Sequence, residues 1–229
     1  MGLRRRVRRR LNLGLAPHKD SVLNTPASPT ITVATANWGG YWDRYGSNWT
    51  EAVLKLDPAP TRVIIASDVP IKTDFEVVIC ETKSLGPMRN AAIDFTDTEW
   101  FVPSDLDDIP LPNYVSGINR DAEIHSFCYK FCNQDHGYRP SQWDNAFEPN
   151  TGNPLASCSA YKTDWAKRIR YRDIGWEDWA FWLDMKKAGA RVHFDQTVRY
   201  IYTHPPGSLS QKDVSRKENE ILTLKRAGW

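Results

Sequence analysis

WFVPSDLDDIPLP, residues 100–112, is the most informative stretch of this sequence. An apolar run at residues 100–102 is followed by Pro103-Ser104 and then by three carboxylates, Asp105, Asp107 and Asp108. This pattern predicts a buried strand whose carboxyl end delivers acidic side chains into a crevice, where open α/β sheets tend to bind ligands. Carboxylates this close in the chain repel one another unless a cation lies among them.

An acidic loop of this kind suits a divalent cation. Mg²⁺ and Mn²⁺ prefer hard oxygen ligands, commonly take one or two carboxylates, and complete their shell with phosphate oxygens and water. The first hypothesis is therefore a metal-bound phosphate ligand. The alternative that these residues leave open is a solvated acidic turn that caps a helix at Pro112-Asn113.

Strands and helices alternate before this stretch. Apolar, β-branched runs predict strands at residues 31–36, 62–66 and 75–80. One helical pattern begins near Asn48 and ends before Pro58, between the first two strands, and another opens at Gly86-Pro87, after the third. The alternation predicts an α/β fold: one domain with a mostly parallel, Rossmann-like sheet flanked by helices.

The middle of the chain is less regular. His125, Cys128, Cys132 and His136 would share one face of a helix and could indicate zinc, but the period-two alternation of residues 124–131 favours a core strand. Turn-forming residues predict a mobile flap at 133–154. Further predicted elements are strands at 155–161, 191–194 and 198–202 and helices at 164–169 and 214–225.

GWEDWAFWLDMKKAG, residues 175–189, predicts a helix that ends at Gly189. Glu177 and Asp178 lie in its first turn, where acidic residues are ordinary helix chemistry. Aromatic residues nearly encircle the helix, which indicates burial. A buried helix with two acids at its mouth is less ordinary and marks a candidate site.

These motifs, taken in order, resemble those of the family 2 glycosyltransferases of GT-A fold. The resemblance rests on Arg89-Asn90, DLDD, GWEDWAFW and YIYTHPPGSLS, and it covers residues 31–210. It implies that Asp107 binds a divalent metal, Mn²⁺ or Mg²⁺, and that Asp105 contacts the metal or the donor ribose. It also implies that His204 closes the metal or diphosphate site.

The same resemblance assigns the donor and the chemistry. Arg89 would meet the diphosphate, Asp68 would lie beside the nucleoside, and Asn37 would belong to the donor site. Asp178 would be the catalytic base, with Glu177 orienting it or touching the acceptor. One base and one in-line attack predict a single displacement with inversion at the anomeric carbon.

The implied function is therefore metal-dependent transfer of a sugar from a nucleoside diphosphate sugar to a hydroxyl group. A uridine diphosphate sugar is the default donor, although residues 67–70, SDVP, depart from the two acids and Gly-Ser usual in the family. Two alternatives stay open: a catalytically inactive binding module that keeps the fold, and a nucleotidyltransferase on a similar sheet. The glycine-rich basic loop that cradles a triphosphate is not found after the first strand.

Charge is unevenly distributed along the chain. Six of the 30 basic residues fall within the first ten positions, so the remainder carries 24 basic against 28 acidic residues. We expect a flexible basic tail and linker at residues 1–29, a catalytic domain at 30–210, and a helix within 211–229 that packs on it. The arginines suit an anionic surface or no specific partner.

Aromatic residues are candidates for the acceptor side. Trp38, Trp42 and Trp176 present faces that suit sugars or bases, and the acceptor is expected to be a saccharide, a protein or DNA with a hydroxylated base. No apolar run is long enough to span a membrane, and none of signal-peptide length follows the arginines. Four cysteines in 229 residues fit a reducing compartment, which predicts a cytoplasmic location.

Overall fold

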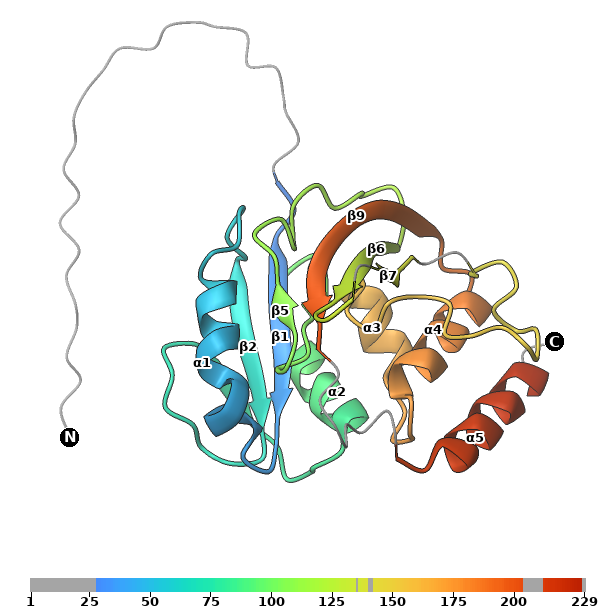
Figure 1. Cartoon of the computed structure of the whole chain (residues 1–229), viewed down its shortest axis with the longest axis horizontal. Coiled ribbons are helices and arrows are strands. Elements are labelled where there is room, and N and C mark those ends of the chain that lie inside the picture. Colours follow the sequence, from blue (N-terminus) through green and yellow to red (C-terminus); the bar gives the residue numbers. More distant parts are fainter. Residues whose placement is uncertain (1–27, 135, 140–141, 204–211, 228–229) are drawn as a thin grey trace, which may run out of the picture.

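The computed structural model describes residues 28–134, 136–139, 142–203 and 212–227 (Figure 1). A curved sheet has helices on both of its faces. Its strands are β1 (Ile31–Asn37), β2 (Arg62–Ser67), β3 (Glu76–Ile79), β4 (Trp100–Pro103), β5 (Ile109–Pro110), β6 (Ile124–Phe131), β7 (Gly137–Tyr138), β8 (Ala160–Lys162) and β9 (Val192–Tyr202). The helices are α1 (Tyr41–Val53), α2 (Leu85–Phe95), α3 (Thr163–Ile169), α4 (Glu177–Lys187) and α5 (Val214–Ala227).

The strand order is β3-β2-β1-β4-β8-β6-β9-β5, with β7 paired to β6. The first four strands are mutually parallel, as are β6 and β9. The remaining pairings, β4 with β8, β8 with β6, β5 with β9 and β7 with β6, are antiparallel. The predicted α/β class is confirmed, and the parallel order is concentrated in the amino-terminal half. The carboxyl end of β4 therefore opens where parallel pairing gives way to antiparallel pairing.

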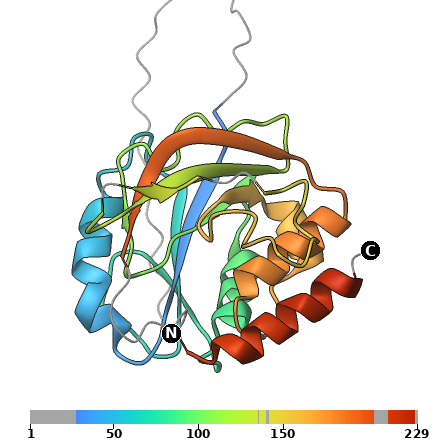
Figure 2. The same cartoon turned by 45° about the vertical axis from the view of Figure 1, so that its right-hand side comes forward.

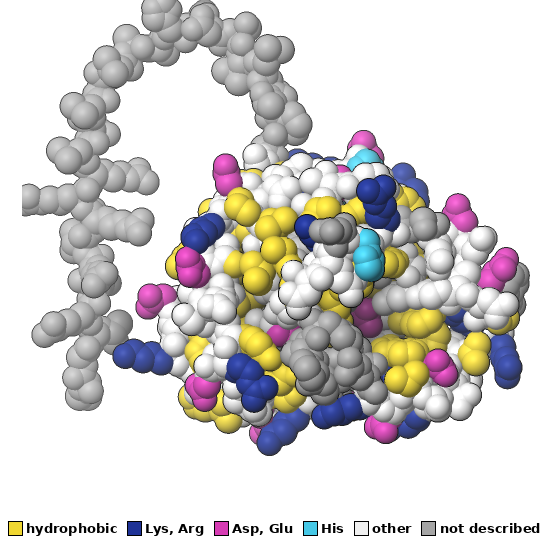
Figure 3. All heavy atoms as spheres, in the orientation of Figure 1, with side chains coloured by type: hydrophobic (Ala, Val, Ile, Leu, Met, Phe, Trp, Pro, Cys, Tyr) yellow, Lys and Arg dark blue, Asp and Glu magenta, His cyan; other side chains and the backbone are white. Residues whose placement is uncertain are grey.

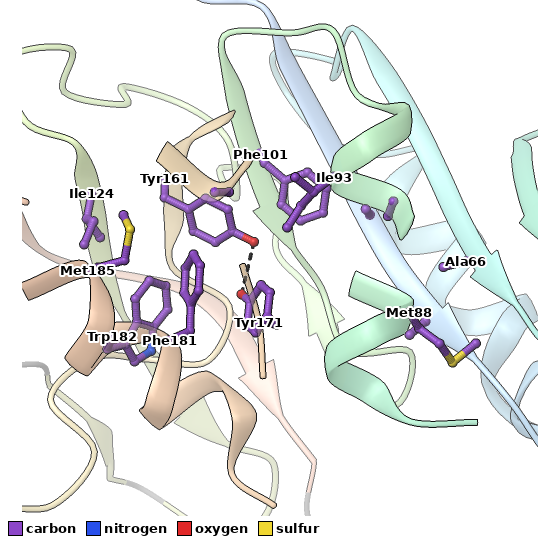
Figure 4. Packing of buried hydrophobic residues seen from close by; sticks show 14 of the residues in the cluster. Ala66, Met88, Ile93, Phe101, Ile124, Tyr161, Tyr171, Phe181, Trp182 and Met185 are labelled. Atoms are coloured by element: carbon purple, nitrogen blue, oxygen red, sulfur yellow. Dashed lines mark hydrogen bonds between the residues drawn. The ribbon is translucent and has the colours of Figure 1, made fainter. Parts of the chain in front are cut away.

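Each face of the sheet covers its own hydrophobic core, because alternate side chains of a strand point to opposite faces. Ala34 and Ala36 of β1 pack with α2 and α4, whereas Ile31 and Val33 pack with α1. Figure 4 shows the first core, where Tyr161, Phe181, Trp182 and neighbouring residues meet α2 side chains. The aromatic helix α4 is thus buried, as its sequence predicts.

Several boundaries differ from the predicted ones. Helix α1 begins at Tyr41 rather than near Asn48, because Gly39 and Gly40 adopt φ of +56° and +82° and turn the chain directly into the helix. The predicted strand at 155–161 shortens to β8, Ala160–Lys162, and the two strands predicted at 191–194 and 198–202 form the single strand β9. The core strand predicted at 124–131 is confirmed as β6.

Helix α5 lies along α4, and both views show the two helices side by side (Figure 2). Ile221 of α5 is buried in a small core with Ala180 and Leu183 of α4. Across the residues that are described, none of the helices is long and apolar enough to cross a bilayer. All four cysteines are free. The arginines of the first ten positions and His204 lie outside the described residues.

Candidate active site

A cavity of about 700 Å³ lies at the carboxyl end of β4. Its walls come from the loop after β4, the first turns of α2 and α4, the segment at 153–157, and the start of α5. Asp107 and Asp178, which sequence reasoning assigned to metal binding and proton transfer, both line it. The structure therefore brings together two acidic motifs that are far apart in the sequence.

Arg89 occupies the centre of the site. Its guanidinium is 5 % exposed and donates to Asp105 Oδ1 at 2.6 Å and to Glu177 Oε1 at 2.8 Å. The planar fork suits two carboxylates at once, and desolvation strengthens both bonds. Asp105 and Glu177 raise the pKa of Arg89 well above its ordinary value, against the effect of burial. Arg89 lines the cavity, and its contact with a donor diphosphate stays a prediction.

Asn90, beside Arg89, fixes α2 to the segment that leads into α4. Its amide group makes two hydrogen bonds with the backbone of Tyr171, each 2.8 Å long. Gly86 permits this approach, because a Cβ there would lie 2.1 Å from the carbonyl oxygen of Arg172. The Arg89-Asn90 pair thus fixes the acidic loop after β4 against the amino-terminal end of α4, which we call its mouth.

The carboxylates after β4 are crowded and partly desolvated. Burial, and then the charge of Asp105, raise the pKa of Asp107 to about 6. The pKa of Asp108 is raised well above its ordinary value for the same two reasons. Asp108 Oδ1 accepts a hydrogen bond from the Thr203 backbone at 2.8 Å, while its buried Oδ2 has no partner among the described residues.

These features fit a divalent cation. Asp105, Asp108 and Cys158 each offer a ligand atom, and the three atoms lie within 4.8 Å of one another. A cation would relieve the repulsion among the carboxylates and satisfy the orphaned oxygen of Asp108. Two of the three ligand atoms are hard carboxylate oxygens, which Mg²⁺ and Mn²⁺ prefer, whereas the third is a soft thiol sulfur. Thr203, which precedes His204, bonds to both Asp107 and Asp108 and so ties the end of β9 to this loop.

The mouth of α4 carries the second pair of acids. Trp176 caps the helix in the left-handed conformation, with φ of 58°, and stacks on Trp179 at 5.5 Å between ring centroids. Burial raises the pKa of Asp178 and raises that of Glu177 to about 7, and Arg89 opposes both shifts. Asp178 Oδ2 accepts a hydrogen bond from Asn153 Nδ2 at 2.7 Å. A carboxylate whose pKa is raised and whose orientation is fixed is a better proton acceptor than a solvated one.

The other predicted site residues divide into two groups. Trp38 and Trp176 line the cavity, whereas Trp42 packs its ring against Gly46 within α1. Asn37 is buried, and its side chain bonds to Ser67 and to the backbone of Trp42. Asp68 lies outside the cavity lining, although its carboxylate is 3.9 Å from Lys83, which does line it. The donor roles of Asn37 and Asp68 stay predictions.

Sequence reasoning missed several residues of the cavity wall. Asn153 and Tyr138 fall in the turn-rich segment 133–154, which has no periodic pattern to single them out. A set of basic side chains from two separate segments also lines the cavity, namely Lys83, Lys212, Arg216 and Lys217. The positions of the last three depend on where α5 packs, which a local pattern does not reveal.

No model of a known protein family matches the sequence, and no curated protein matches it. Solved structures do match. A fragment of S. aureus TarS, residues 1–349, in complex with UDP-GlcNAc aligns with a TM-score of 0.67 at 17% identity, over 87% of this chain and 66% of that one. The chain spans only 37% of a longer TarS structure.

Two further structures agree with this match. The mannosyltransferase PcManGT from Pyrobaculum calidifontis, bound to GDP-Man and Mn²⁺, aligns with a TM-score of 0.54 at 14% identity, over 89% of this chain and 74% of that one. Glucosyl-3-phosphoglycerate synthase from Mycobacterium tuberculosis, bound to Mn²⁺, UDP and its product, aligns with a TM-score of 0.59 at 12% identity, over 88% and 80%. The fold of this chain is that of the GT-A glycosyltransferases.

Proposed function

We propose that this protein is a metal-dependent glycosyltransferase that moves a sugar from a nucleoside diphosphate sugar to a hydroxyl acceptor with inversion. The observation that carries the proposal is that Asp107 and Asp178 line one cavity. The acids after β4 supply carboxylates for a cation, and the mouth of α4 supplies a separate base. Sugar transfer needs both functions in one pocket.

The proposed reaction is a single displacement. A divalent cation held by Asp105 and Asp107 would neutralise charge on the departing diphosphate. Asp178 takes the proton of the acceptor hydroxyl while that oxygen bonds to the anomeric carbon and the bond to the diphosphate oxygen breaks. Arg89 holds Asp105 and Glu177 in place through one hydrogen bond to each carboxyl group. No covalent enzyme intermediate forms, so the product has the opposite anomeric configuration to the donor.

The proposed donor is a uridine diphosphate sugar. TarS and the glucosyl-3-phosphoglycerate synthase were solved with uridine nucleotides, and PcManGT with GDP-Man. The proposed acceptor is a saccharide or a protein that packs against Trp38 and Trp176, since aromatic faces suit sugar rings. On the face shown in Figure 3, described acidic and basic side chains are interspersed, which does not single out a polyanion such as DNA.

The decisive experiment is to incubate the protein with a panel of UDP- and GDP-sugars and Mn²⁺ or Mg²⁺, and to measure nucleoside diphosphate release. Hydrolysis of one donor would identify the sugar before the acceptor is known. Asp107→Ala should abolish release, whereas Asp74→Ala, at an exposed carboxylate outside the cavity lining, should not. A wild-type protein that binds nucleotide but releases none from any donor would favour the inactive binding module. Release of pyrophosphate from a nucleoside triphosphate would favour a nucleotidyltransferase.

A further inference from the structure

Lys225, near the end of α5, is a buried charge with a built set of partners. Its side chain is among the largest that are fully buried, at 1 % exposure. The ammonium donates to the carbonyl oxygens of Glu148 at 2.8 Å and Thr151 at 2.7 Å, and to Thr151 Oγ1 at 3.0 Å. It also lies 4.9 Å from the ring centroid of Trp179 in α4. An ammonium removed from water needs such partners, so Lys225 clamps the segment at 148–151 between the two helices.

The residue that follows the clamped segment by two positions, Asn153, contacts Asp178. Asn153, two residues after Thr151, donates its amide to Asp178 Oδ2 at 2.7 Å. On its other side, Tyr138 of β7 donates its hydroxyl to the carbonyl oxygen of Asn153 at 2.7 Å. Asn153 is therefore held from α5 through the backbone and from β7 through Tyr138. Asn153 and Tyr138 both line the cavity.

From these contacts we infer that Asn153 is a positioning residue for Asp178, and that Lys225 acts on Asp178 through it. This inference rests on the proposed function, in which Asp178 is the base. The amide of Asn153 bonds the charged form of the carboxylate, which favours that form and restricts its rotation. Because the segment is fixed at both sides, this bond is in place before an acceptor arrives.

Several other ionisable groups interact electrostatically with Asp178. They are Glu177 on its own helix, Arg89 of α2, Asp105 after β4, Tyr129 of β6, Tyr138 of β7 and Tyr171 before α4. Lys217 of α5 lies over the ring of Trp176, at the start of α4. The amide of Asn153 does not titrate. Its replacement therefore changes the environment of Asp178 without removing a charge from the site.

The test is Asn153→Leu, which keeps the approximate size and removes the hydrogen-bond donor. We expect kcat for transfer to fall by about tenfold or more, the value for a lost hydrogen bond to a charged group, while the nucleotide Kd changes less than about twofold. The acid limb of the kcat profile should move to higher pH, because the ionised carboxylate loses a donor. Asn153→Gln, which keeps an amide, should recover part of the rate. Wild-type kcat and an unshifted acid limb in Asn153→Leu would overturn the inference.

Lys225→Met tests the clamp. We expect faster amide exchange in residues 148–153 and a smaller loss of kcat in the same direction, with no further loss when it is combined with Asn153→Leu. Arg226→Met, at the exposed neighbouring position on α5, is the control and should match wild type. Losses of kcat that multiply in the double variant would show that Lys225 does not act through Asn153.

A readout that does not need activity separates this inference from the proposed function. If the wild-type protein transfers no sugar, the titration of the Asp178 carboxyl carbon can still be followed by NMR. The pKa of Asp178 should be higher in Asn153→Leu than in wild type. A raised pKa in a silent enzyme would leave the positioning intact and refute the transferase, whereas an unchanged pKa would refute the positioning.

Discussion

Arg89 and Glu177, 88 positions apart in the sequence, form a buried ion pair with 2.8 Å between Nη1 and Oε1. The same guanidinium holds Asp105. The Arg89 guanidinium therefore links the acidic loop after β4 to the amino-terminal end of α4.

Replacing Arg89 by methionine should destabilise the protein strongly. Asp105 and Glu177 would lose their buried counter-charge, and breaking a buried pair in this way costs about 3–5 kcal/mol. Urea unfolding at pH 7 measures the change. Arg120→Met removes a more exposed pair with Glu99, 2.8 Å apart, and should cost less than about 1 kcal/mol. Equal costs for the two variants would contradict the central role given to Arg89.

Asp178→Asn should lower kcat by about 10²–10⁴, the usual contribution of a general base, and should leave nucleotide affinity nearly unchanged. In the wild type, transfer should slow as pH falls through the pKa of Asp178, which burial holds above 3.8. Steady-state kinetics across pH measure both effects. Asp184→Asn on the same helix, whose carboxylate pairs with Arg172 at 2.6 Å, is the matched control and should stay within about twofold of wild type.

Asp107→Asn should weaken Mn²⁺ binding by about tenfold or more, because the amide replaces an anionic ligand. Cys158→Ser should leave the affinity within about twofold, since Mn²⁺ and Mg²⁺ favour oxygen over thiolate and burial raises the pKa of Cys158 well above its ordinary value. Calorimetric titration with Mn²⁺ measures both constants. The opposite ranking would place the metal among Asp105, Asp108 and Cys158 instead of at Asp107.

Glu123 should make stability depend on pH. It accepts three hydrogen bonds from Arg191, which lower its pKa from 4.5 to about 2. A carboxyl with a lowered pKa stabilises the fold above the unfolded pKa and loses that contribution as pH falls toward the folded one. Because Arg191 is 69% exposed, we expect Glu123→Gln to cost only about 1–2 kcal/mol at pH 7.

Chemical unfolding at pH 7, 5 and 3 checks the Glu123 prediction. The difference in free energy of unfolding between wild type and Glu123→Gln should persist from pH 7 to 5 and become smaller by pH 3. Glu51→Gln removes the pair that Glu51 of α1 makes with Lys55, just after the helix. Because both side chains of that pair are exposed, this variant should differ little from wild type at any of the three pH values. A gap that is constant across all three values would mean that shape, and not charge, makes Glu123 stabilising.

The sequence predicts the parts of this protein that depend on local periodicity. The apolar runs of β1, β2 and β4 and the acids that follow β4 were predicted from neighbouring residues alone. The buried state of α4 followed from its aromatic residues. The start of α1 was missed, because two glycines with positive φ set it and no helical pattern precedes Asn48.

The contacts that assemble the site were beyond local reasoning. The resemblance implies that Arg89 meets the diphosphate, but its pairing with Glu177 depends on how α2 meets α4. Lys225 was missed because it binds backbone carbonyl oxygens, which every residue possesses and no motif marks. Asn153 was missed because it lies in a turn-rich segment whose conformation is set by those same long-range bonds.

The clamp made by Lys225 also gives the site an order of completion during synthesis. A ribosome releases the carboxylates after β4 and at the mouth of α4 well before it releases Lys225. A nascent chain that ends before α5 would therefore carry the acids after β4 and those at the start of α4, with Asn153 held only through Tyr138. The bonds from Lys225 to the backbone of Glu148 and Thr151 would form only after α5 has emerged.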